Sequence, residues 1–341
     1  MNTFRCSIDL SSIISKRNEF NLHNDDENFS NRVKTKRRFS HSINLLLNHL
    51  TSSRVDDVGL QLWTGCFLLA DFVIYSRNSF KDVVILELGT GVGFVAVVFK
   101  YIVSNHLGMV YTDYKDRIVN LAVENVERNS HLSLQSFLPL LESTTLHCPD
   151  TQSQPASTIV GRIFDWSSDF NPRSETPTTG SKIPESSWTM EDRHLLQNNR
   201  TVFLAADVLY DDALTVHFFK KIAEMMKQGD EYLVLTLEKR VNFSVHLLRE
   251  VATCYDLFRF LIHHTSMAAV TTEEMVRIIL CQQESPPLSN YPTDRMIEDI
   301  EFIRSRWLRG EQLPLDDIPQ YVLSYERNKF MEIWKISSLN S

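Results

Sequence analysis

The sequence predicts a mixed α/β fold: a seven-stranded, Rossmann-like sheet that is mostly parallel and ends in an antiparallel hairpin. An apolar, β-branched run at 83–88, VVILEL, precedes a glycine-rich turn, as a buried parallel strand does. Strand-like and helix-like segments then alternate, which is typical of a parallel sheet covered by helices. The terminal stretch at 321–336, YVLSYERNKFMEIWKI, predicts two strands joined by a turn at 327–328.

The alternation can be followed element by element. Apolar residues recur at helical spacing in several segments, and these predict helices at 60–75, 92–104, 115–129, 212–228 and 243–254. Short apolar runs that end at an acid or a small residue predict further strands at 109–112, 157–165, 201–206 and 231–238. Together with 83–88 and the terminal pair, these runs make a seven-stranded sheet.

Composition divides the chain into a main domain, an extension and two long loops. We expect residues 1–57 to form a partly disordered N-terminal extension and residues 58–341 to form the main domain. Stretches near 131–157 and 167–198 are rich in Ser, Thr and Pro and predict long loops. A short basic run at 34–38 fits a solvated segment or a nuclear-import signal.

Charge and cysteine content exclude several classes of protein. The 341 residues carry a formal net charge of −8, which disfavours bulk nucleic-acid binding and leaves a cationic substrate plausible. The five cysteines are scattered and form no Cys-x-x-Cys pair, so we expect a reducing compartment, no zinc site and no disulfide framework. The N-terminus lacks a signal-peptide core, and the most apolar region contains Glu87 and Lys100, so no membrane association is expected.

The glycine-rich turn predicts a ligand site. Gly89, Gly91 and Gly93 stand where a strand passes into a helix, so backbone N–H groups can face a ligand. Their spacing differs from the G-x-G-x-x-G pattern of dinucleotide sites, and the Lys of a Walker motif is absent. The acid Glu87 would repel a pyrophosphate but suits a ligand with an ammonium group, such as S-adenosylmethionine.

Further candidates stand at the ends of the next predicted strands. Asp113 is placed to accept hydrogen bonds from ribose hydroxyls, or to cap the helix that starts at Lys115. Trp166 can stack on adenine while Asp165 accepts from its amine; the alternative is a core Trp beside a solvated Asp. Asp207 ends another strand and is either a site residue or the cap of the following helix.

With these elements in place, the chain resembles the seven-strand, S-adenosylmethionine-dependent class I methyltransferases, specifically the methyltransferase family 16 protein-lysine enzymes. The likeness covers about residues 56–130 and 160–336. Thr90 and Val92 depart from the usual Ala and Thr of the glycine motif. The segments that carry the resemblance are QLWTG, ILELGTGVG, YTD, FDW and AADVLY.

The resemblance implies S-adenosyl-L-methionine as cofactor and a role for each matching residue. The residues implied to contact this methyl donor are Trp63, Gly89, Thr90, Gly91, Asp113, Trp166 and Ala206, beside Glu87, Gly93 and Asp165 from the reasoning above. Asp207 and Tyr210 are implied to be catalytic, on the side of a lysine acceptor. No metal ligand is expected.

The resemblance also implies a partner and a location. We expect a monomer in the nucleus or cytoplasm that methylates a lysine-bearing protein client, such as a Kin-type DNA- and RNA-binding zinc-finger protein. A small-molecule or nucleic-acid N-methyltransferase is the alternative, although Val208 and Leu209 replace the two prolines that such enzymes often carry before the Tyr. A non-catalytic protein that keeps the cofactor pocket is disfavoured by the intact acids.

Overall fold

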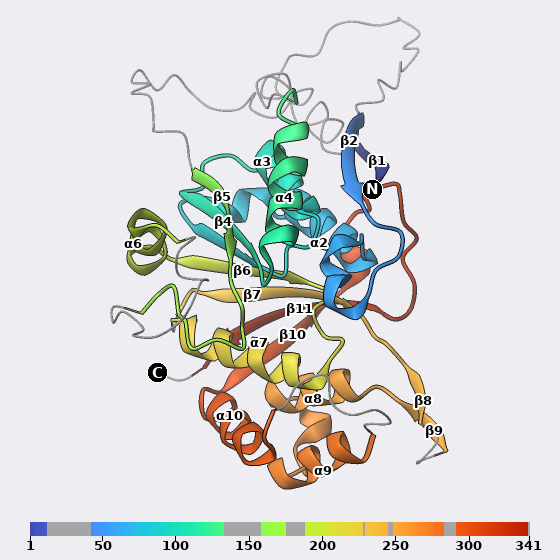
Figure 1. Ribbon diagram of the computed structural model, residues 1–341, viewed down its shortest axis with the longest axis vertical. Coiled ribbons are helices and arrows are strands. Elements are labelled where there is room, and N and C mark those ends of the chain that lie inside the picture. The colour runs from blue at the N-terminus through green and yellow to red at the C-terminus, as the bar shows by residue number, and fades with distance from the viewer. Residues whose placement is uncertain are drawn as a thin grey trace, which may run out of the picture.

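A single large sheet organises the molecule, with helices on both of its faces (Figure 1). The computed structural model describes residues 1–11, 42–132, 158–174, 188–227, 229–244, 248–282 and 291–339. The helices α2, α3 and α4 cover one face, and α7, α8 and α10 cover the other. Each face has its own apolar core, because the central strands carry buried side chains on both sides.

The seven strands of this sheet confirm the predicted fold class. They lie in the order β10-β11-β7-β6-β3-β4-β5. β3 pairs in parallel with both β4 and β6, whereas β11 runs antiparallel to β7 and β10. The bounds are β3 Val84–Leu88, β4 Gly108–Asp113, β5 Thr158–Ile163, β6 Thr201–Ala206, β7 Tyr232–Glu238, β10 Leu308–Leu313 and β11 Met331–Ser338.

The partner of the last strand differs from the prediction. β11 pairs with β10 at 308–313, and residues 321–326 do not join the large sheet. Val322 instead forms a bridge with Ile8, and a buried carboxylate on α2 holds the same segment. Asp71 Oδ1 accepts the N–H groups of Tyr321 and Val322 at 2.7 and 2.8 Å, so these groups are not available to a neighbouring strand.

The helices are framed by three-residue to six-residue 3-10 turns and by caps. The α-helices of the described residues are α2 Thr64–Tyr75, α3 Phe94–Ile102, α4 Asp116–Arg128, α6 Met190–Asn198, α7 Asp212–Met225, α8 Thr253–Leu261, α9 Thr272–Gln282 and α10 Thr293–Ser305. The 3-10 turns are η1 Val55–Leu60, η2 Arg77–Phe80, η5 Thr265–Met267 and η6 Leu315–Asp317. The predicted helices before residue 230 are therefore all present, with shorter bounds.

Two predicted segments fold differently. The helix expected at 243–254 is instead a projecting hairpin, β8 Asn242–Ser244 with β9 Arg249–Val251, ahead of α8. Its apolar side chains Phe243 and Leu248 are exposed, so their helical spacing meets no core. Within the loop expected at 167–198, α6 forms because Thr189 and Asp192 make a capping box, which fixes the first turn.

The chain's first residues pack on the α2–α4 face. β1 Asn2–Asp9 and β2 Ser42–His49 form an antiparallel hairpin whose Cys6 and Leu47 are fully buried in that core. Two asparagines of α4 hold the edge of β2: Asn125 Oδ1 accepts from Asn48 N at 2.7 Å, and Asn129 Oδ1 accepts from Leu46 N at 3.0 Å. Residues 12–41 lie outside the described residues, so the extent of the N-terminal extension stays a prediction.

Candidate functional site

A cavity of about 330 Å³ opens at the carboxyl ends of β3, β4 and β6. Open α/β sheets bind ligands at this edge, next to the point where the strand order reverses. Most of the predicted site residues line this cavity, which we call the site cavity: Trp63, Gly89, Gly91, Asp113, Asp165, Trp166, Ala206, Asp207 and Tyr210. The remaining three, Glu87, Thr90 and Gly93, do not line it.

The glycine loop shows why two of its glycines face the cavity and one does not. Gly89 and Gly91 have φ of 75° and 54°, a left-handed conformation that other residues rarely adopt. A Cβ atom on Gly89 would lie 2.8 Å from Val208 Cγ1, so glycine keeps this wall open. A Cβ on Gly93 would instead lie 2.9 Å from Ala122, so the third glycine allows α3 to pack on α4.

Glu87 lies beneath the loop rather than in the cavity. Its side chain is 2 % exposed, and Thr90 Oγ1 donates to Glu87 Oε2 at 3.0 Å. Burial raises the pKa of Glu87 to about 8, so the carboxyl group is mostly neutral at pH 7 in this geometry. A mostly neutral Glu87 would attract the ammonium group of S-adenosylmethionine less strongly than a carboxylate. The sequence-based argument for this ligand from the charge of Glu87 is therefore weakened.

Asp113 ties the end of β4 to the glycine loop. Its Oδ2 accepts from Gly91 N and its Oδ1 from Tyr114 N, both at 2.9 Å. Burial raises the pKa of Asp113 to about 6. The first residue before α4 is Lys115, which makes no side-chain cap, so Asp113 is not the cap of that helix. Each oxygen keeps a lone pair for a ligand hydroxyl.

The aromatic wall contains an unpaired hydrogen-bond donor. Trp166 packs edge to face on Phe218 with ring centroids 5.1 Å apart. Its Nε1 is buried and has no hydrogen-bond partner, and such buried donors are rare in folded proteins. The neighbouring Asp165 accepts from Ser167 N at 2.9 Å and shapes the turn that follows β5.

Asp207 sits at the end of β6 in a strained conformation, with φ of 54°. Gly65 N donates to its Oδ2 at 2.6 Å, and Glu238 N donates to its Oδ1 at 2.8 Å. Burial raises the pKa of this carboxyl above its usual range. Asp211, not Asp207, caps α7 by accepting from Leu214 N at 2.8 Å, so the helix-cap alternative does not hold.

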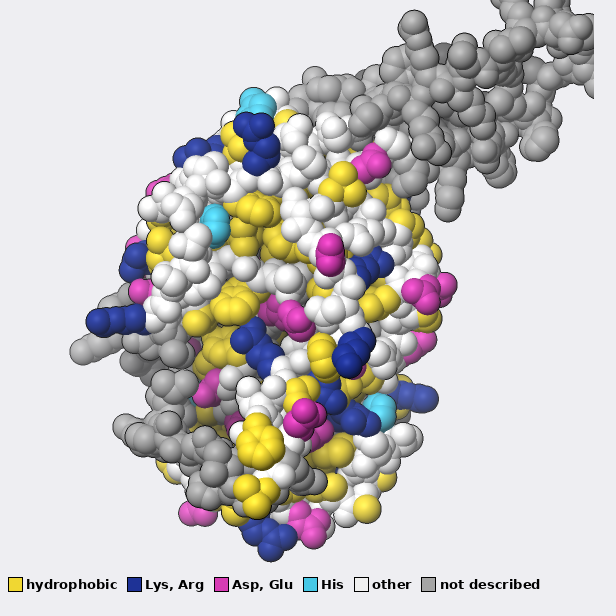
Figure 2. Space-filling view, turned by 90° about the vertical axis from the view of Figure 1, so that its right-hand side faces the viewer, with side chains coloured by type: hydrophobic (Ala, Val, Ile, Leu, Met, Phe, Trp, Pro, Cys, Tyr) yellow, Lys and Arg dark blue, Asp and Glu magenta, His cyan; other side chains and the backbone are white. Residues whose placement is uncertain are grey.

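A smaller pocket joins the site cavity at Asp207 and Tyr210, which line both. We call it the adjoining pocket, and Arg240 lines both as well. Burial raises the pKa of Tyr210, so its hydroxyl stays protonated. Figure 2 views the side from which the β8–β9 hairpin projects, where acidic and basic side chains interrupt apolar surface.

Sequence reasoning missed the two basic residues at this pocket. Lys239 Nζ lies 4.6 Å from the centroid of the Tyr255 ring, and the Arg240 guanidinium lies 4.8 Å from that of the Trp63 ring. Both residues follow β7 directly. The strand-end rule that selected Asp113 and Asp207 would have selected them too, had it been applied to every predicted strand.

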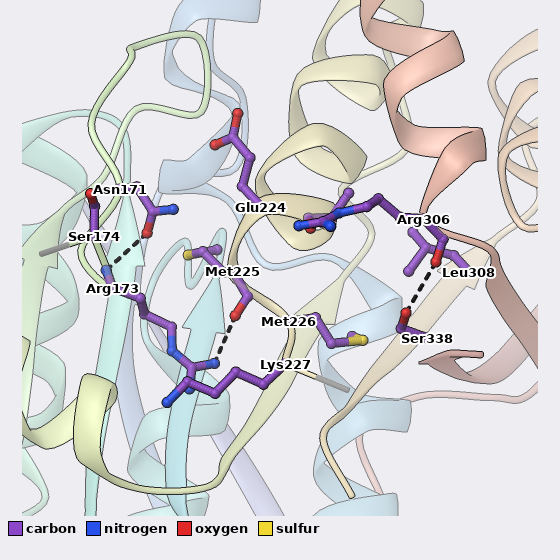
Figure 3. Close-up of a pocket in the computed structure, with 11 residues that line it drawn as sticks. Asn171, Arg173, Ser174, Glu224, Met225, Met226, Lys227, Arg306, Leu308 and Ser338 are labelled. Carbon is purple, nitrogen blue, oxygen red and sulfur yellow. Dashed lines mark hydrogen bonds between the residues drawn. The ribbon is translucent and has the colours of Figure 1, made fainter. Parts of the chain in front are cut away.

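A second cavity, of about 470 Å³, lies at the other end of α7 and holds none of the predicted residues (Figure 3). Its charged groups are paired within the protein. Arg173 Nη1 and Nη2 donate to the two oxygens of Glu231 at 2.7 and 2.8 Å, and both side chains are buried. Arg306 Nε donates to the carbonyl of Ala223 at 3.1 Å. We call this space the far cavity.

The described ranges contain neither a metal-binding cluster nor a membrane-spanning helix. No cluster there brings together three His, Cys, Asp or Glu side chains that could hold a metal ion. No helix in the same ranges is long and apolar enough to cross a membrane. The cysteines of the described part, Cys6, Cys66, Cys254 and Cys281, are all free thiols.

The strand order and the position of the site cavity define the seven-strand methyltransferase fold. Residues 45–142 match a family model described as lysine methyltransferase. The chain is 28% identical over 221 residues to methyltransferase-like protein 22 of Homo sapiens, covering 64% of this chain and 47% of that protein. It is 29% identical over 299 residues to methyltransferase-like protein 22 of Mus musculus, covering 87% and 59%. The predicted resemblance to methyltransferase family 16 is confirmed.

The matches cover only part of the curated relatives, and the sequence identity to solved structures is low. The chain spans about half to three-fifths of the curated relatives that it matches, 47% and 59% of their lengths. Among solved structures, the O-methyltransferase TomG from Streptomyces achromogenes, in complex with SAM, is 10% identical with a TM-score of 0.34. The match covers 83% of this chain and 82% of that one. Likeness at this level supports no functional conclusion.

Proposed function

We propose that this chain transfers a methyl group from S-adenosyl-L-methionine to the side-chain amine of a lysine in a protein client. One observation carries the proposal: the site cavity and the adjoining pocket meet at Asp207 and Tyr210, which line both. A methyl donor in the first space and an amine in the second would therefore face each other. The matched family model, described as lysine methyltransferase, supports the same reaction.

The residues of the site cavity fit this cofactor. The left-handed glycines allow a ligand close to the backbone, and Asp113 keeps lone pairs for ribose hydroxyls. The Trp166 side chain lines the same cavity and offers an apolar surface to an adenine ring. When bound, the cofactor supplies an electrophilic methyl group: the amine lone pair forms the C–N bond while the C–S bond breaks and its electrons stay on sulfur.

The chain's own residues prepare the amine. A free lysine has a pKa near ~10.4, so it must lose a proton before it can attack. Burial in the adjoining pocket and the positive charge of Arg240 both lower that pKa. Asp207 orients the incoming ammonium with its remaining lone pairs, and the proton leaves to water or to this carboxylate. The protonated Tyr210 aligns the amine through its hydroxyl.

The resemblance supports a client and a location as well. We propose a nuclear or cytoplasmic monomer whose client is a lysine-bearing nucleic-acid-binding protein of the Kin type. The basis is the likeness to methyltransferase-like protein 22. The net charge of −8 agrees with a protein that binds its client rather than the client's nucleic acid.

The test uses tritiated methyl donor, cell extract and the purified chain, followed by mass spectrometry of labelled material. We expect label on protein lysines. Asp207→Asn should lower transfer at least about 100-fold while the dissociation constant for the methyl donor changes only a few-fold, because Asp207 acts on the acceptor. Asp294→Asn, an exposed acid at the start of α10, is the matched control and should keep full activity.

Two results would contradict the proposal. Label in RNA or in small metabolites, with none in protein, would favour the alternative N-methyltransferase. Loss of methyl-donor binding in a folded Asp207→Asn variant would move Asp207 from the acceptor side to the cofactor side. Thermal unfolding of each variant distinguishes both results from a failure to fold.

A further inference from the structure

The adjoining pocket carries two cations that have no ionic partner in the described part of the chain. Lys239 and Arg240 are absent from the ion pairs found there, although each is held over an aromatic ring at 4.6 and 4.8 Å. The rings restrict where the two cations can point, which lowers the entropic cost of binding an anion between them.

The carboxylates around the same pocket are already engaged. Both oxygens of Asp207 accept backbone N–H groups, as described above. Glu238 Oε2 accepts from Thr64 Oγ1 at 2.6 Å, and its Oε1 accepts from Asn328 Nδ2 at 2.8 Å. On the far side of Tyr255, Glu332 accepts a hydrogen bond from the Tyr255 hydroxyl at 3.0 Å and another from Trp334 Nε1 at 2.7 Å. The pocket therefore offers free cationic donors, while its acceptors are largely occupied.

This imbalance bears on which lysine can enter. A lysine side chain that approaches Asp207 through this pocket also comes close to the positive charges of Lys239 and Arg240, and like charges repel. An acidic residue beside that lysine would offset the repulsion and occupy the free cations. We propose that Lys239 and Arg240 select, as methylation targets, lysines that have an Asp or Glu within about three residues in the client.

This inference rests on the proposed lysine methylation and adds the sequence context of the target. A nucleic acid is the other anion that two cations beside aromatic rings could bind. The structure disfavours it, because the cations already cover one face of Trp63 and one face of Tyr255, and bases need such faces for stacking. The far cavity provides the contrast within the same molecule, since both Nη atoms of its Arg173 donate to Glu231 in a buried ion pair.

The test presents the purified chain and tritiated S-adenosylmethionine with a peptide library that has one central lysine and randomised flanks, and with a denatured proteome. Methylated lysines are sequenced by mass spectrometry. We expect Asp and Glu to be enriched about 1.5- to 5-fold near methylated lysines, the range that exposed ion pairs give. In Lys239→Gln and Arg240→Gln the enrichment should fall, and in the double variant it should vanish.

Lys335→Gln is the matched control. Lys335 is an exposed lysine whose Nζ lies 4.6 Å from the Tyr232 ring centroid, but this pair sits at the start of β7, the opposite end of the strand from Lys239. It should keep both the activity and the acidic preference. The affinity of each variant for S-adenosylmethionine is measured by calorimetry in parallel. Arg240 also lines the site cavity, so it could bind the carboxylate of the cofactor instead of an acidic residue of the client.

The outcomes separate the two proposals. Lysine methylation without acidic enrichment, or enrichment that survives the double variant, overturns the selection by Lys239 and Arg240 and leaves lysine methylation standing. If Arg240→Gln keeps the acidic enrichment and loses more than 10-fold in affinity for the methyl donor, Arg240 binds the cofactor. That result overturns the role of Arg240 in selecting acidic targets. Label in RNA overturns the inference in favour of a nucleic-acid acceptor, and no label on any lysine sinks both proposals.

Discussion

Helix α7 runs between two cavities whose neighbouring buried carboxylates have different kinds of partners. At its start, around the site cavity, Glu87, Asp113 and Asp207 are held by a hydroxyl and by backbone N–H groups. At its end, beside the far cavity, Glu231 is paired through both oxygens with the buried guanidinium of Arg173. In the described part of the chain the first three acids form no ion pair, although Lys115 and Arg240 act on Asp113 and Asp207 from a greater distance.

This difference in partners indicates which end of α7 lies beside a ligand-binding site. Burial without a cation raises the pKa values of Glu87 and Asp113 to about 8 and about 6. Perturbed acids in a cavity mark functional sites more often than paired ones do. A ligand that brings hydroxyl or cationic groups would stabilise Asp113 and Asp207, which line the site cavity, whereas both oxygens of Glu231 are already paired with Arg173.

The largest effect is expected from breaking the pair at the far cavity. Arg173→Met should lower the free energy of unfolding by about 3–5 kcal/mol, because it leaves the buried Glu231 without its cation. Urea unfolding measures this change, and calorimetry should show unchanged affinity for S-adenosylmethionine. A loss below about 1 kcal/mol, or a weaker cofactor affinity, would undo the contrast between the two ends.

An effect of comparable size, spread over several pH units, is expected from the buried acid under the glycine loop. The folded-state pKa of Glu87, about 8, exceeds its ordinary value of 4.5, so the folded state keeps a proton that the unfolded state loses. Its contribution to stability is therefore complete below pH 4.5 and falls by about 1.4 kcal/mol per pH unit up to about pH 8.

Glu87→Gln removes this titration and keeps an acceptor for Thr90 Oγ1. Urea unfolding from pH 5 to pH 9 should therefore give a flatter stability profile for the variant than for the unchanged chain, with the variant the more stable of the two above pH 8. Parallel profiles for the two proteins would show that Glu87 is ionised throughout and that its burial is compensated in some other way.

The smallest effect concerns the acid on the cavity wall. Asp113→Asn should weaken S-adenosylmethionine binding about 10- to 100-fold, the value of hydrogen bonds to a charged group, because an amide offers one acceptor oxygen instead of two. Calorimetry provides the affinity. Thermal unfolding provides the stability, which should also fall, because the amide nitrogen would face one of the two backbone N–H donors. An unaltered affinity would remove Asp113 from the cofactor site and leave it only the role of tying β4 to the glycine loop.

The central sheet and the glycine loop could be predicted because their signals are local. Val84–Leu88 reads as a buried strand from its own composition, and Gly89, Gly91 and Gly93 all have positive φ. The candidate acids were found by one further rule, that parallel strands end at a common edge. The same rule, applied to the residues after β7, would have added Lys239 and Arg240.

Other features depended on contacts far away in sequence. Nothing in residues 321–326 indicates that Asp71 takes two of their N–H groups or that Val322 forms a bridge with Ile8, and with these contacts the segment lies outside the large sheet. The neutral state of Glu87 is likewise a property of burial, which a motif cannot report. Only α6 carried a readable local signal that was overlooked, the Thr189–Asp192 capping box.

The Asp71 contacts also set when the site can be completed. Asp71 lies on α2, and it binds Tyr321, Val322, Tyr325 and Arg327, which stand 250 to 256 positions later. The same helix begins with Gly65, whose N–H group holds Asp207. A ribosome therefore adds 250 further residues after Asp71 before α2 gains the first of these partners for its buried carboxylate. The helix that holds Asp207 thus depends on residues made long after it.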